Sequence, residues 1–378
     1  MKIAAISTSR IPSNTANSIQ VMKVCQALKQ VGNDVKLWVP KFKTASWLEL
    51  AEKYGISTPY EIEWLEFHNN LKQYDFCWKS VQTGIQWGAD VVYTWALQAA
   101  VFNSLRNKTT VMEFHDYPMG LLGPFWFRIF LHSPGKKILL TTTRALANGI
   151  QERFHLKIPE EILQIAPNGT DLERYQALPH SSEARFQLGL AERFTIMYSG
   201  HFYPGRGLEL MLGLAQALPQ FQFLWIGGQD EDIEPWKKRL RTLGIQNVII
   251  TGFINNARLP LYQAAGDILL MPYQREIAGS SGGNIVKVIN PMKMFDYMAT
   301  RRAILASDIP IFHEVLNNQN AIFCPPEDLN SWIKAILTLA NNKPKRDKLA
   351  RQAGKDAVLF TWDNRASQTL AKLRTIAY

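Results

Sequence analysis

The stretch MYSGHFYPGRGLELMLGLAQAL, residues 197–218, decides which fold is predicted for this chain. An apolar run, residues 194–198, ends at a serine and a glycine, and a loop with two more glycines follows. Beyond the loop, apolar side chains recur at helical spacing: Leu208, Leu210, Met211, Leu214 and Leu218. This order of features predicts a buried strand that leads through a tight turn into a helix.

The turn between this strand and this helix contains Gly200, His201, Gly205, Arg206 and Gly207. One explanation is an anion site, because a helix N-terminus presents free N–H groups and glycine lets the backbone approach a ligand. The other explanation is a tight turn with a solvated arginine. The turn matches neither the Walker pattern nor G-x-G-x-x-G, so both explanations stay open.

Similar apolar runs recur along the chain and alternate with helical segments, which is typical of parallel sheets with right-handed crossovers. The runs predict strands at 2–7, 34–40, 90–95, 110–115, 137–143 and 163–169, and again at 194–200, 221–228, 248–253, 267–273, 303–308 and 321–326. Two such sets predict two Rossmann-like domains. Because Pro, His and Ser interrupt the pattern within 174–185, we place the boundary there and expect domains at 1–180 and 181–363.

Composition agrees with a two-domain globular protein. The chain has 378 residues, which is more than one hydrophobic core usually supports. Its formal net charge of +10 is spread over both halves, which favours anionic partners such as nucleotides or an anionic membrane face. No zinc-finger or RNA-binding motif occurs, so we expect no nucleic-acid partner.

Cysteine usage and hydropathy favour the cytoplasm. The three cysteines, Cys25, Cys77 and Cys324, lie far apart in apolar patterns, as reduced thiols do. The first residues resemble a strand rather than a signal peptide, and no run reaches the roughly 20 apolar residues that span a bilayer. We therefore expect a cytoplasmic protein, at most peripheral on the inner face of a membrane.

A second segment with candidate site residues is KVINPMKMFDYMATRRAILASD, residues 287–308. Asn290 is a candidate N-cap and Pro291 fits the first helical turn. Lys293 and Asp296 lie three positions apart on the predicted helix. In that place Asp296 suits the two hydroxyls of a ribose, or it only complements the helix dipole.

The run NPMKMFDYMATRRAILASDIPIFHEVL resembles the sugar-donor signature of the retaining GT-B glycosyltransferases of the glycosyltransferase-4 (group 1) family. That signature reads S-P-x-K-x-x-E-Y-M-A, then G-x-P-I-x-A-S-D. YSGHFYPGRGLEL takes the place of the family's glycine turn, and TVMEFHD, IAPNGTD and VIITGF follow the family order. The resemblance implies the GT-B fold, in which two Rossmann-like parallel-sheet domains face a central cleft. It also implies that a C-terminal helix at about 364–378 packs back on the first domain.

The resemblance also implies roles for single residues. Arg206 would pair with the diphosphate of a nucleotide sugar near the Gly200 backbone and the His201 and Gly207 positions. Phe253 lies where the nucleobase is held, and Asp296 where the family has its ribose-binding glutamate.

Other implied contacts involve the segment 290–293 and the first domain. Asn290, Met292 and Lys293 occupy the turn whose backbone contacts the sugar or phosphates, and His115 matches the histidine beneath the reacting sugar. His115, Arg206 and Lys293 are thus the implied catalytic residues.

This chain departs from the family at several positions. A histidine, His201, replaces the first basic residue of the glycine turn, and Val288 replaces the first signature glutamate. The run 280–283 fits a loop that closes over the sugar donor. The N-terminal loop has Ser13, Asn14 and Asn17 where the family has glycines. These residues either meet the diphosphate and acceptor or only cap the helix.

We therefore expect a retaining glycosyltransferase that moves a hexose from a nucleotide-diphosphate sugar to a hydroxyl acceptor: a glycan, a glycolipid or a small polyol. No cofactor and no metal is expected, and the D-x-D match at 230–232 is interpreted as a solvated turn. The apolar, basic-edged stretch 118–137 is either a membrane contact or a buried helix. The alternatives are a non-catalytic nucleotide-sugar-binding subunit that assists a partner transferase, motivated by His201 and Val288, and a nucleotide-sugar epimerase.

Overall fold

The computed structural model describes residues 1–71, 73–118, 120, 122–277 and 284–376. The chain divides into two compact units, each built on its own sheet. The first contains residues 1–168, 288–290 and the segment from Trp362 onward, and the second contains 169–287 and 291–361.

The first unit is built on a parallel sheet with the strand order β3-β2-β1-β4-β5-β6-β7. The order along the chain reverses between β1 and β4, which makes this position the topological switch point of the sheet. The strands are β1 Lys2–Ile6, β2 Asp34–Pro40, β3 Glu61–Leu65, β4 Val91–Thr94, β5 Thr110–Phe114, β6 Lys137–Thr141 and β7 Leu163–Ile165.

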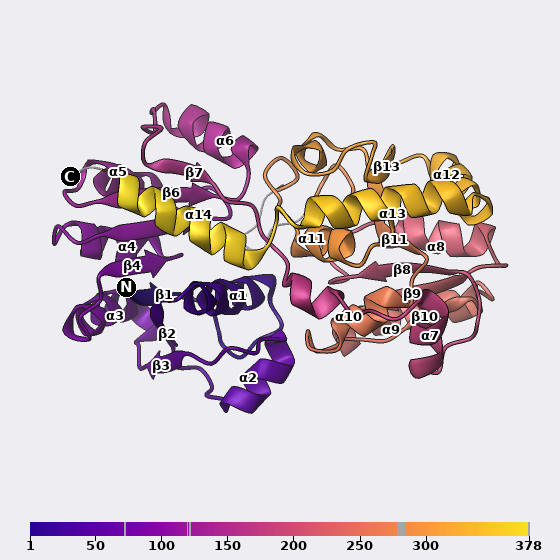
Figure 1. Ribbon diagram of the computed structural model, residues 1–378, viewed down its shortest axis with the longest axis horizontal. Coiled ribbons are helices and arrows are strands. Elements are labelled where there is room, and N and C mark those ends of the chain that lie inside the picture. Colours follow the sequence, from indigo (N-terminus) through magenta and orange to yellow (C-terminus); the bar gives the residue numbers. More distant parts are fainter. Residues whose placement is uncertain (72, 119, 121, 278–283, 377–378) are drawn as a thin grey trace. The chain divides into compact units, whose positions relative to one another are not determined.

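Helices cover both faces of this sheet. On one face α3 and α4 pack on Ile6, Trp38 and Val92, while α1 lies against the C-terminal helix α14 (Figure 1). The helices are α1 Ala16–Gln30, α2 Trp47–Tyr54, η1 Asn69–Leu71, α3 Tyr74–Gln86, α4 Leu97–Ser104, α5 Gly123–His132, α6 Arg144–Phe154 and α14 Trp362–Thr375.

The second unit repeats this plan with the strand order β10-β9-β8-β11-β12-β13, all parallel. Its switch point lies between β8 and β11. The strands are β8 Thr195–Ser199, β9 Gln222–Ile226, β10 Val248–Ile250, β11 Ile268–Met271, β12 Ala303–Ser307 and β13 Ala321–Cys324.

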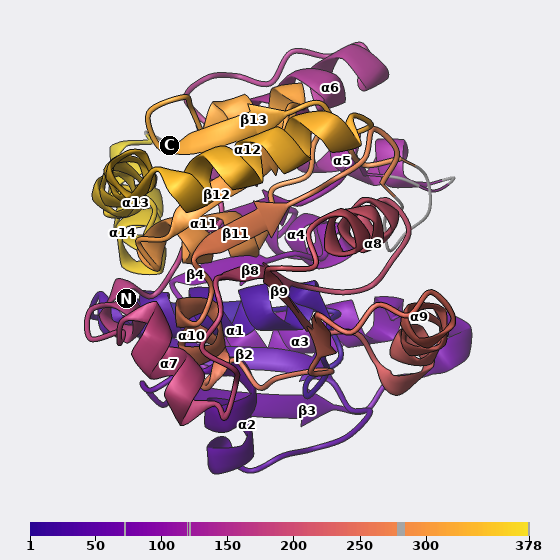
Figure 2. The ribbon, with the colours of Figure 1, turned by 90° about the vertical axis from the view of Figure 1, so that its right-hand side faces the viewer.

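Helices lie on both sides of this second sheet as well (Figure 2). The apolar faces of α8, α9 and α12 pack with Tyr198, Trp225 and Leu270 in one core. The helices are η2 Leu172–Tyr175, α7 Ser181–Gln187, α8 Leu208–Ala217, α9 Asp230–Thr242, α10 Leu259–Ala264, α11 Met292–Ala299, η3 Pro310–Glu314, α12 Leu329–Asn341 and α13 Lys343–Ala357.

The predicted fold class of two parallel α/β domains is confirmed, with two differences in detail. The strand β3 was not predicted: it lies at the sheet edge, where Glu61 and Glu63 pair with Lys36 and interrupt the apolar run. The units meet in the chain at 168–169 rather than near residue 180. The stretch 174–185 lies within the second unit, where His180 is the N-cap residue of α7.

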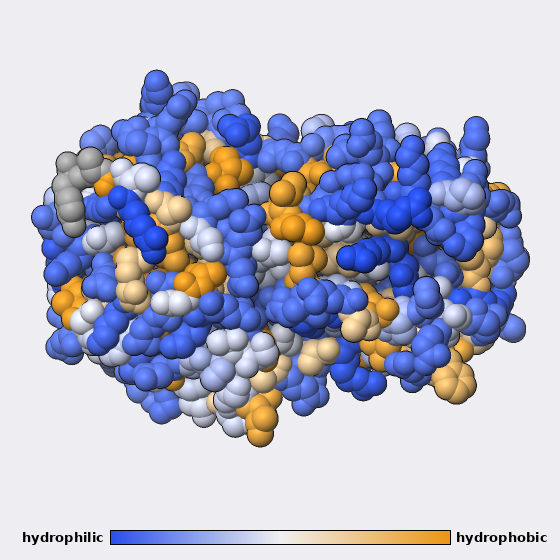
Figure 3. Space-filling model, viewed as in Figure 1, coloured by the Kyte–Doolittle hydropathy of each residue, from blue (hydrophilic) through white to orange (hydrophobic). Residues whose placement is uncertain are grey.

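The surface and the thiols are ordinary for a globular protein. The face in Figure 3 is mainly hydrophilic, with small scattered hydrophobic patches. Cys25, Cys77 and Cys324 are buried and free. Among the described residues, no helix combines the length and the apolar character that a membrane span requires.

Candidate functional site

The glycine-rich turn after β8 lies at the switch point of the second sheet. Gly205 and Gly207 have φ values of +82° and +81°, and Gly207 is the N-cap residue of α8. A Cβ on either residue would lie well under 3.0 Å from the backbone of Glu276 or Pro272. These glycines are therefore required for close packing of the turn against the segment that follows β11.

Gly200 has a different reason to be glycine. A Cβ there would lie well under 3.0 Å from the Lys293 ammonium nitrogen, and its φ is +150°. Gly227, at the end of β9, would likewise clash with the Gly200 carbonyl. The missing side chain of Gly200 thus leaves room for the Lys293 ammonium, and that of Gly227 lets the end of β9 pack on the Gly200 backbone.

Lys293, in the first turn of α11, fills that room with a buried charge. Its Nζ lies 3.9 Å from the centroid of the Tyr198 ring and 5.3 Å from that of Tyr273. This atom is shielded from solvent and has no hydrogen-bond partner among the described residues. Burial, and next the charge of Arg206, lower the pKa of Lys293 well below its ordinary value.

Arg206 provides a second cation at the same switch point. Its guanidinium carbon lies 5.0 Å from the centroid of the Tyr273 ring, so Tyr273 contacts both cations. Two like charges this close are unfavourable unless an anion joins them. A buried ammonium without a partner, next to a guanidinium and two helix N-termini, is suited to bind a phosphate-bearing group.

Three other implied sugar-donor residues, His201, Phe253 and Met292, belong to the same unit as these two cations. His201 stacks on the Tyr203 ring with a centroid distance of 4.7 Å. Phe253 follows β10 and Gly252, and Met292 is the first residue of α11.

Asp296 already has a hydroxyl partner. Its Oδ1 accepts a hydrogen bond of 2.9 Å from the Thr170 hydroxyl. Its contact with a ribose stays a prediction.

Asn290 does not cap α11. The N-cap residue is Pro291, and Asn290 belongs to the first unit. Its Oδ1 accepts a hydrogen bond of 2.7 Å from the Asn168 N–H, and its carbonyl accepts one of 2.6 Å from the Asn168 side-chain amide. The interpretation as a helix cap is wrong because this side chain joins the loop that follows β7.

The N-terminal loop serves both as a cap and as a cavity wall. Thr15 is the N-cap of α1 and accepts from the Ser18 N–H, and the Ser13 hydroxyl bonds to the hydroxyls of both residues. Asn17 lines a cavity in the first unit, and the Asn14 Oδ1 is buried without a hydrogen-bond partner in the described structure.

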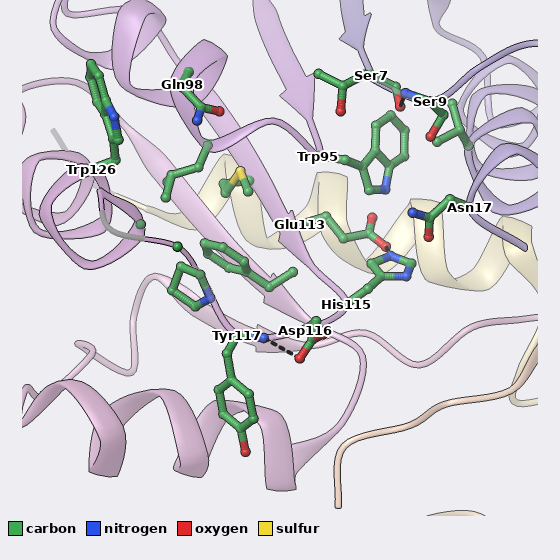
Figure 4. A pocket seen from close by; sticks show the side chains of 18 of the residues that line it. Ser7, Ser9, Asn17, Trp95, Gln98, Glu113, His115, Asp116, Tyr117 and Trp126 are labelled. Atoms are coloured by element: carbon green, nitrogen blue, oxygen red, sulfur yellow. Dashed lines mark hydrogen bonds and ion pairs between the residues drawn. The ribbon is translucent and has the colours of Figure 1, made fainter. Parts of the chain in front are cut away.

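That cavity, with a volume of about 490 Å³, lies at the switch point of the first sheet, beyond the ends of β1, β4 and β5 (Figure 4). His115 points into it beside Glu113. Further described residues that line it are Ser7, Thr8, Ser9, Gln20, Val21, Tyr74, Trp95, Leu97, Gln98, Met112, Phe114, Asp116, Tyr117, Pro118, Gly120, Leu122, Gly123 and Trp126.

A buried carboxylate holds His115 in place. The Nε2 of His115 lies 2.6 Å from the Glu113 Oε1, and this carboxylate also accepts from the Gln20 side-chain amide at 2.6 Å and from the Tyr93 hydroxyl. Arg365 of α14 forms an ion pair with it at 2.6 Å. Because Nε2 faces Glu113, the Nδ1 of His115 is the nitrogen left for other contacts.

Electrostatics keep Glu113 ionised. Burial alone would raise its pKa, but the Arg365 charge and the hydrogen bonds from His115 and Tyr93 lower the pKa to about 2. Neither Glu113 nor Arg365 was predicted as a site residue from the sequence. The signal for Glu113 was its position two residues before His115, because alternate residues of a strand point to the same side.

Other expectations have simpler outcomes. The run 280–283 lies outside the described residues. Asp230, Glu231 and Asp232 form the first turn of α9 rather than a loop, and Asp232 accepts a hydrogen bond from the Gln229 N–H. The described part of the chain contains no cluster of three or more His, Cys, Asp or Glu side chains arranged to hold a metal ion.

Comparison with known proteins agrees with this geometry. Residues 193–342 match the family model described as Glycosyl transferases group 1. The alpha-galactosylglucosyldiacylglycerol synthase of Streptococcus pneumoniae is 23% identical over 282 residues, which are 70% of this chain and 72% of that protein. The sulfoquinovosyl transferase SQD2 of Arabidopsis thaliana is 24% identical over 220 residues, 57% of this chain and 40% of that protein.

Solved structures resemble the whole chain. The Anabaena protein HepE, in complex with UDP-glucose, has a TM-score of 0.75 at 18% identity and covers 100% of each chain. Sucrose-phosphate synthase from Thermosynechococcus elongatus has a TM-score of 0.75 at 18% identity, over 99% of this chain and 98% of that one. The fold is thus that of the GT-B class, and the sequence matches are to glycosyltransferases. Residues 193–342 resemble the group 1 glycosyltransferases, whose family model they match.

Proposed function

We propose that this protein is a retaining hexosyltransferase that takes its hexose from a nucleotide-diphosphate sugar and passes it to a hydroxyl acceptor without a metal ion. The observation that carries the proposal is the buried Lys293 ammonium, which has no hydrogen-bond partner in the described structure and lies on the same tyrosine ring as Arg206. A diphosphate would supply the anion that neither cation finds among the described residues.

The chemistry of the leaving group supports this assignment. A nucleoside diphosphate leaves with additional negative charge, and fixed cations that stabilise this charge lower the barrier. Arg206, Lys293 and the N-termini of α8 and α11 are the groups that we propose for this role. HepE was solved with UDP-glucose, which supports a uridine nucleotide as the first sugar donor to test.

The state of Glu113 supports retention of configuration through attack on the same face. This carboxylate is bound to Gln20, Tyr93, His115 and Arg365, so it is not free to act as a nucleophile. In the proposed reaction the leaving phosphate takes the proton from the acceptor hydroxyl. His115 contacts the sugar through Nδ1.

A peripheral membrane contact is the proposed role of part of the stretch 118–137, on the cytoplasmic side of the membrane. Leu122 and Phe125 are 50% and 57% exposed at the start of α5, whereas Phe127 and Phe130 are buried in the unit. The apolar contact would therefore come from the first turn of α5 and not from the whole helix.

A screen of sugar donors tests the proposal. UDP-, GDP- and ADP-hexoses are added to the purified chain with EDTA, and thermal stabilisation and slow hydrolysis of the sugar donor are measured. We expect both effects with one nucleotide and their loss in Arg206→Ala and Asp296→Ala. Lys238→Ala, which removes an exposed cation of α9, is the matched control and should behave as the parent.

Two results would contradict parts of this proposal. An absence of stabilisation and hydrolysis with every nucleotide, in a folded protein, would refute a catalytic transferase. Activity that EDTA abolishes would refute independence from metal. NMR of the first product shows whether the anomeric configuration is retained.

A further inference from the structure

The cavity of the first unit has one polar end and one apolar end (Figure 4). Ser7, Ser9, Trp95, Asn17 and His115 lie together at one end. Trp126 lies on the other side of the view, where Gln98 is also drawn, and the apolar side chains of Leu97, Phe114 and Leu122 complete much of the remaining wall. A ligand that fills the whole cavity must therefore be polar at one end and apolar at the other.

The polar end has an unsatisfied hydrogen-bond donor and an unsatisfied acceptor. The indole N–H of Trp95 and the side-chain oxygen of Gln20 are buried without partners in the part of the chain that the structure describes. Buried polar atoms are normally paired. A hydroxyl group both donates and accepts, so a hydroxyl-rich ligand satisfies both atoms.

The charges of the cavity disfavour an anion. Among the described lining residues none is Lys or Arg, whereas two are carboxylates, Glu113 and Asp116. The Glu113 charge is compensated by Arg365, but Asp116 adds negative charge to the wall. A phosphorylated sugar would be desolvated here without a cation, which is costly.

The apolar end borders an exposed apolar rim. Trp126 donates its indole N–H to the Tyr74 hydroxyl at 3.1 Å, so its only polar atom is already satisfied. The centroids of the Phe125 and Trp126 rings lie 6.1 Å apart. Phe125 is 57% exposed and Leu122 is 50% exposed. An apolar chain that starts beside Trp126 can continue along this rim.

We infer that the acceptor is an uncharged glycoside of an apolar alcohol, with its sugar at Trp95 and Gln20 and its apolar aglycone at Trp126 and Leu122. This inference rests on the proposed transfer reaction and names the class of acceptor. Free sugars and sugar phosphates lack the apolar part or carry a charge that the cavity does not compensate.

Calorimetric binding to the full chain tests the assignment. The probes are methyl and octyl glucosides and galactosides of both anomers, below their micelle concentrations, and glucose 6-phosphate. Each methylene that enters an apolar cavity tightens binding by about fourfold. We expect the octyl glycoside of the preferred sugar to bind at least about tenfold tighter than its methyl counterpart.

Two variants and one control locate the two halves of the ligand. Leu122→Arg should abolish the preference for octyl over methyl, because a charge replaces an apolar wall. Trp95→Phe should weaken both glycosides by the same factor, about fivefold for one hydrogen bond. Leu105→Arg changes an equally exposed leucine, at 54%, that does not line the cavity, and should leave both affinities unchanged.

The inference is overturned if octyl glycosides bind no tighter than methyl glycosides, if the preference survives in Leu122→Arg, or if glucose 6-phosphate binds more tightly than every glycoside. Hydrolysis of the sugar donor without any acceptor is followed in parallel. Its absence, together with an absence of thermal stabilisation by every nucleotide sugar, would refute the proposed transferase. Hydrolysis or stabilisation alongside any of these binding results would refute only the acceptor class.

Discussion

Replacing Arg365 with methionine should destabilise the first unit far more than an ordinary surface substitution. The variant keeps most of the volume of the side chain but removes the charge that compensates Glu113, whose side chain is 0% exposed. Breaking a buried ion pair by removing one partner costs about 3–5 kcal/mol. The pKa of Glu113 gives a similar figure: a fall from 4.5 to about 2 corresponds to about 3 kcal/mol.

The effect also has a defined dependence on pH. Because the pKa of folded Glu113 is below its ordinary value, ionisation of this carboxyl stabilises the fold above about pH 4.5 and ceases to do so as the pH falls towards 2. In Arg365→Met the burial remains and the largest compensating charge is lost. The pKa of Glu113 should then rise, so the acid-side loss of stability that this carboxyl causes in the parent should shrink or disappear in the variant. The deficit in stability relative to the parent should be largest near neutral pH and should narrow as the pH falls.

Hydrogen exchange measured by mass spectrometry reports this free energy locally. Peptides that cover β5 and β6 should lose protection in Arg365→Met, whereas peptides that cover β11 serve as an internal reference in the other unit. Arg374→Met removes an exposed arginine of the same helix and is the matched control. The double variant with Glu113→Gln should recover part of the loss, because no uncompensated charge remains.

A cost of less than about 1 kcal/mol at β5 in Arg365→Met would refute the reasoning, because the ion pair would then behave as a solvated surface pair. Strict additivity of the two substitutions would refute it equally. In either case Arg365 would not be the group that keeps Glu113 ionised.

Three further substitutions or reactions test the second unit and the thiols. Lys293→Met should abolish stabilisation by the sugar donor in a thermal-shift assay. The melting temperature of the free protein should stay equal or rise, because a buried unpaired charge is removed. A lower melting temperature of the free variant would contradict this. Gly207→Ala should lower the free energy of unfolding by more than about 2 kcal/mol. Gly189 also has a positive φ but has open space around it, so Gly189→Ala should cost only about 1 kcal/mol. Equal losses in denaturant titrations would refute the argument that Gly207 is required for close packing. Burial raises the pKa of the Cys324 thiol to about 12. This thiol should therefore react with a disulfide reagent at pH 8 only after unfolding. Fast labelling of Cys324 in the native chain would contradict its burial.

The strands were predictable because burial on both faces leaves continuous apolar runs in the sequence. The strand β2 agrees with its predicted range, residues 34–40, and the other predicted runs contain their strands. The edge strand β3 alternates Glu61 and Glu63 with apolar residues, so it contains no continuous apolar run by which it could be predicted. Hydrophobicity therefore identifies the buried strands of such a sheet more readily than its edges.

The candidate site was only partly accessible to sequence reasoning. Arg206, Lys293 and His115 were predicted because they stand in segments that resemble motifs of the family, two of them in turns after strands and Lys293 at the start of a helix. Arg365 lies in a helix far away in the sequence, and nothing in its neighbours distinguishes it from an exposed arginine. Asn290 was misinterpreted because its hydrogen-bond partner, Asn168, lies on a loop distant in the sequence. Contacts of this kind depend on topology and leave no local pattern.

The return of α14 to the first unit affects how the chain folds as it is synthesised. Translation proceeds from the N-terminus, so Glu113 emerges from the ribosome long before Arg365, with the whole second unit made in between. Until then the first unit contains a buried carboxylate without its guanidinium partner. We therefore expect the nascent first unit to remain a labile intermediate and to reach its full stability only after residues 362–375 have been made.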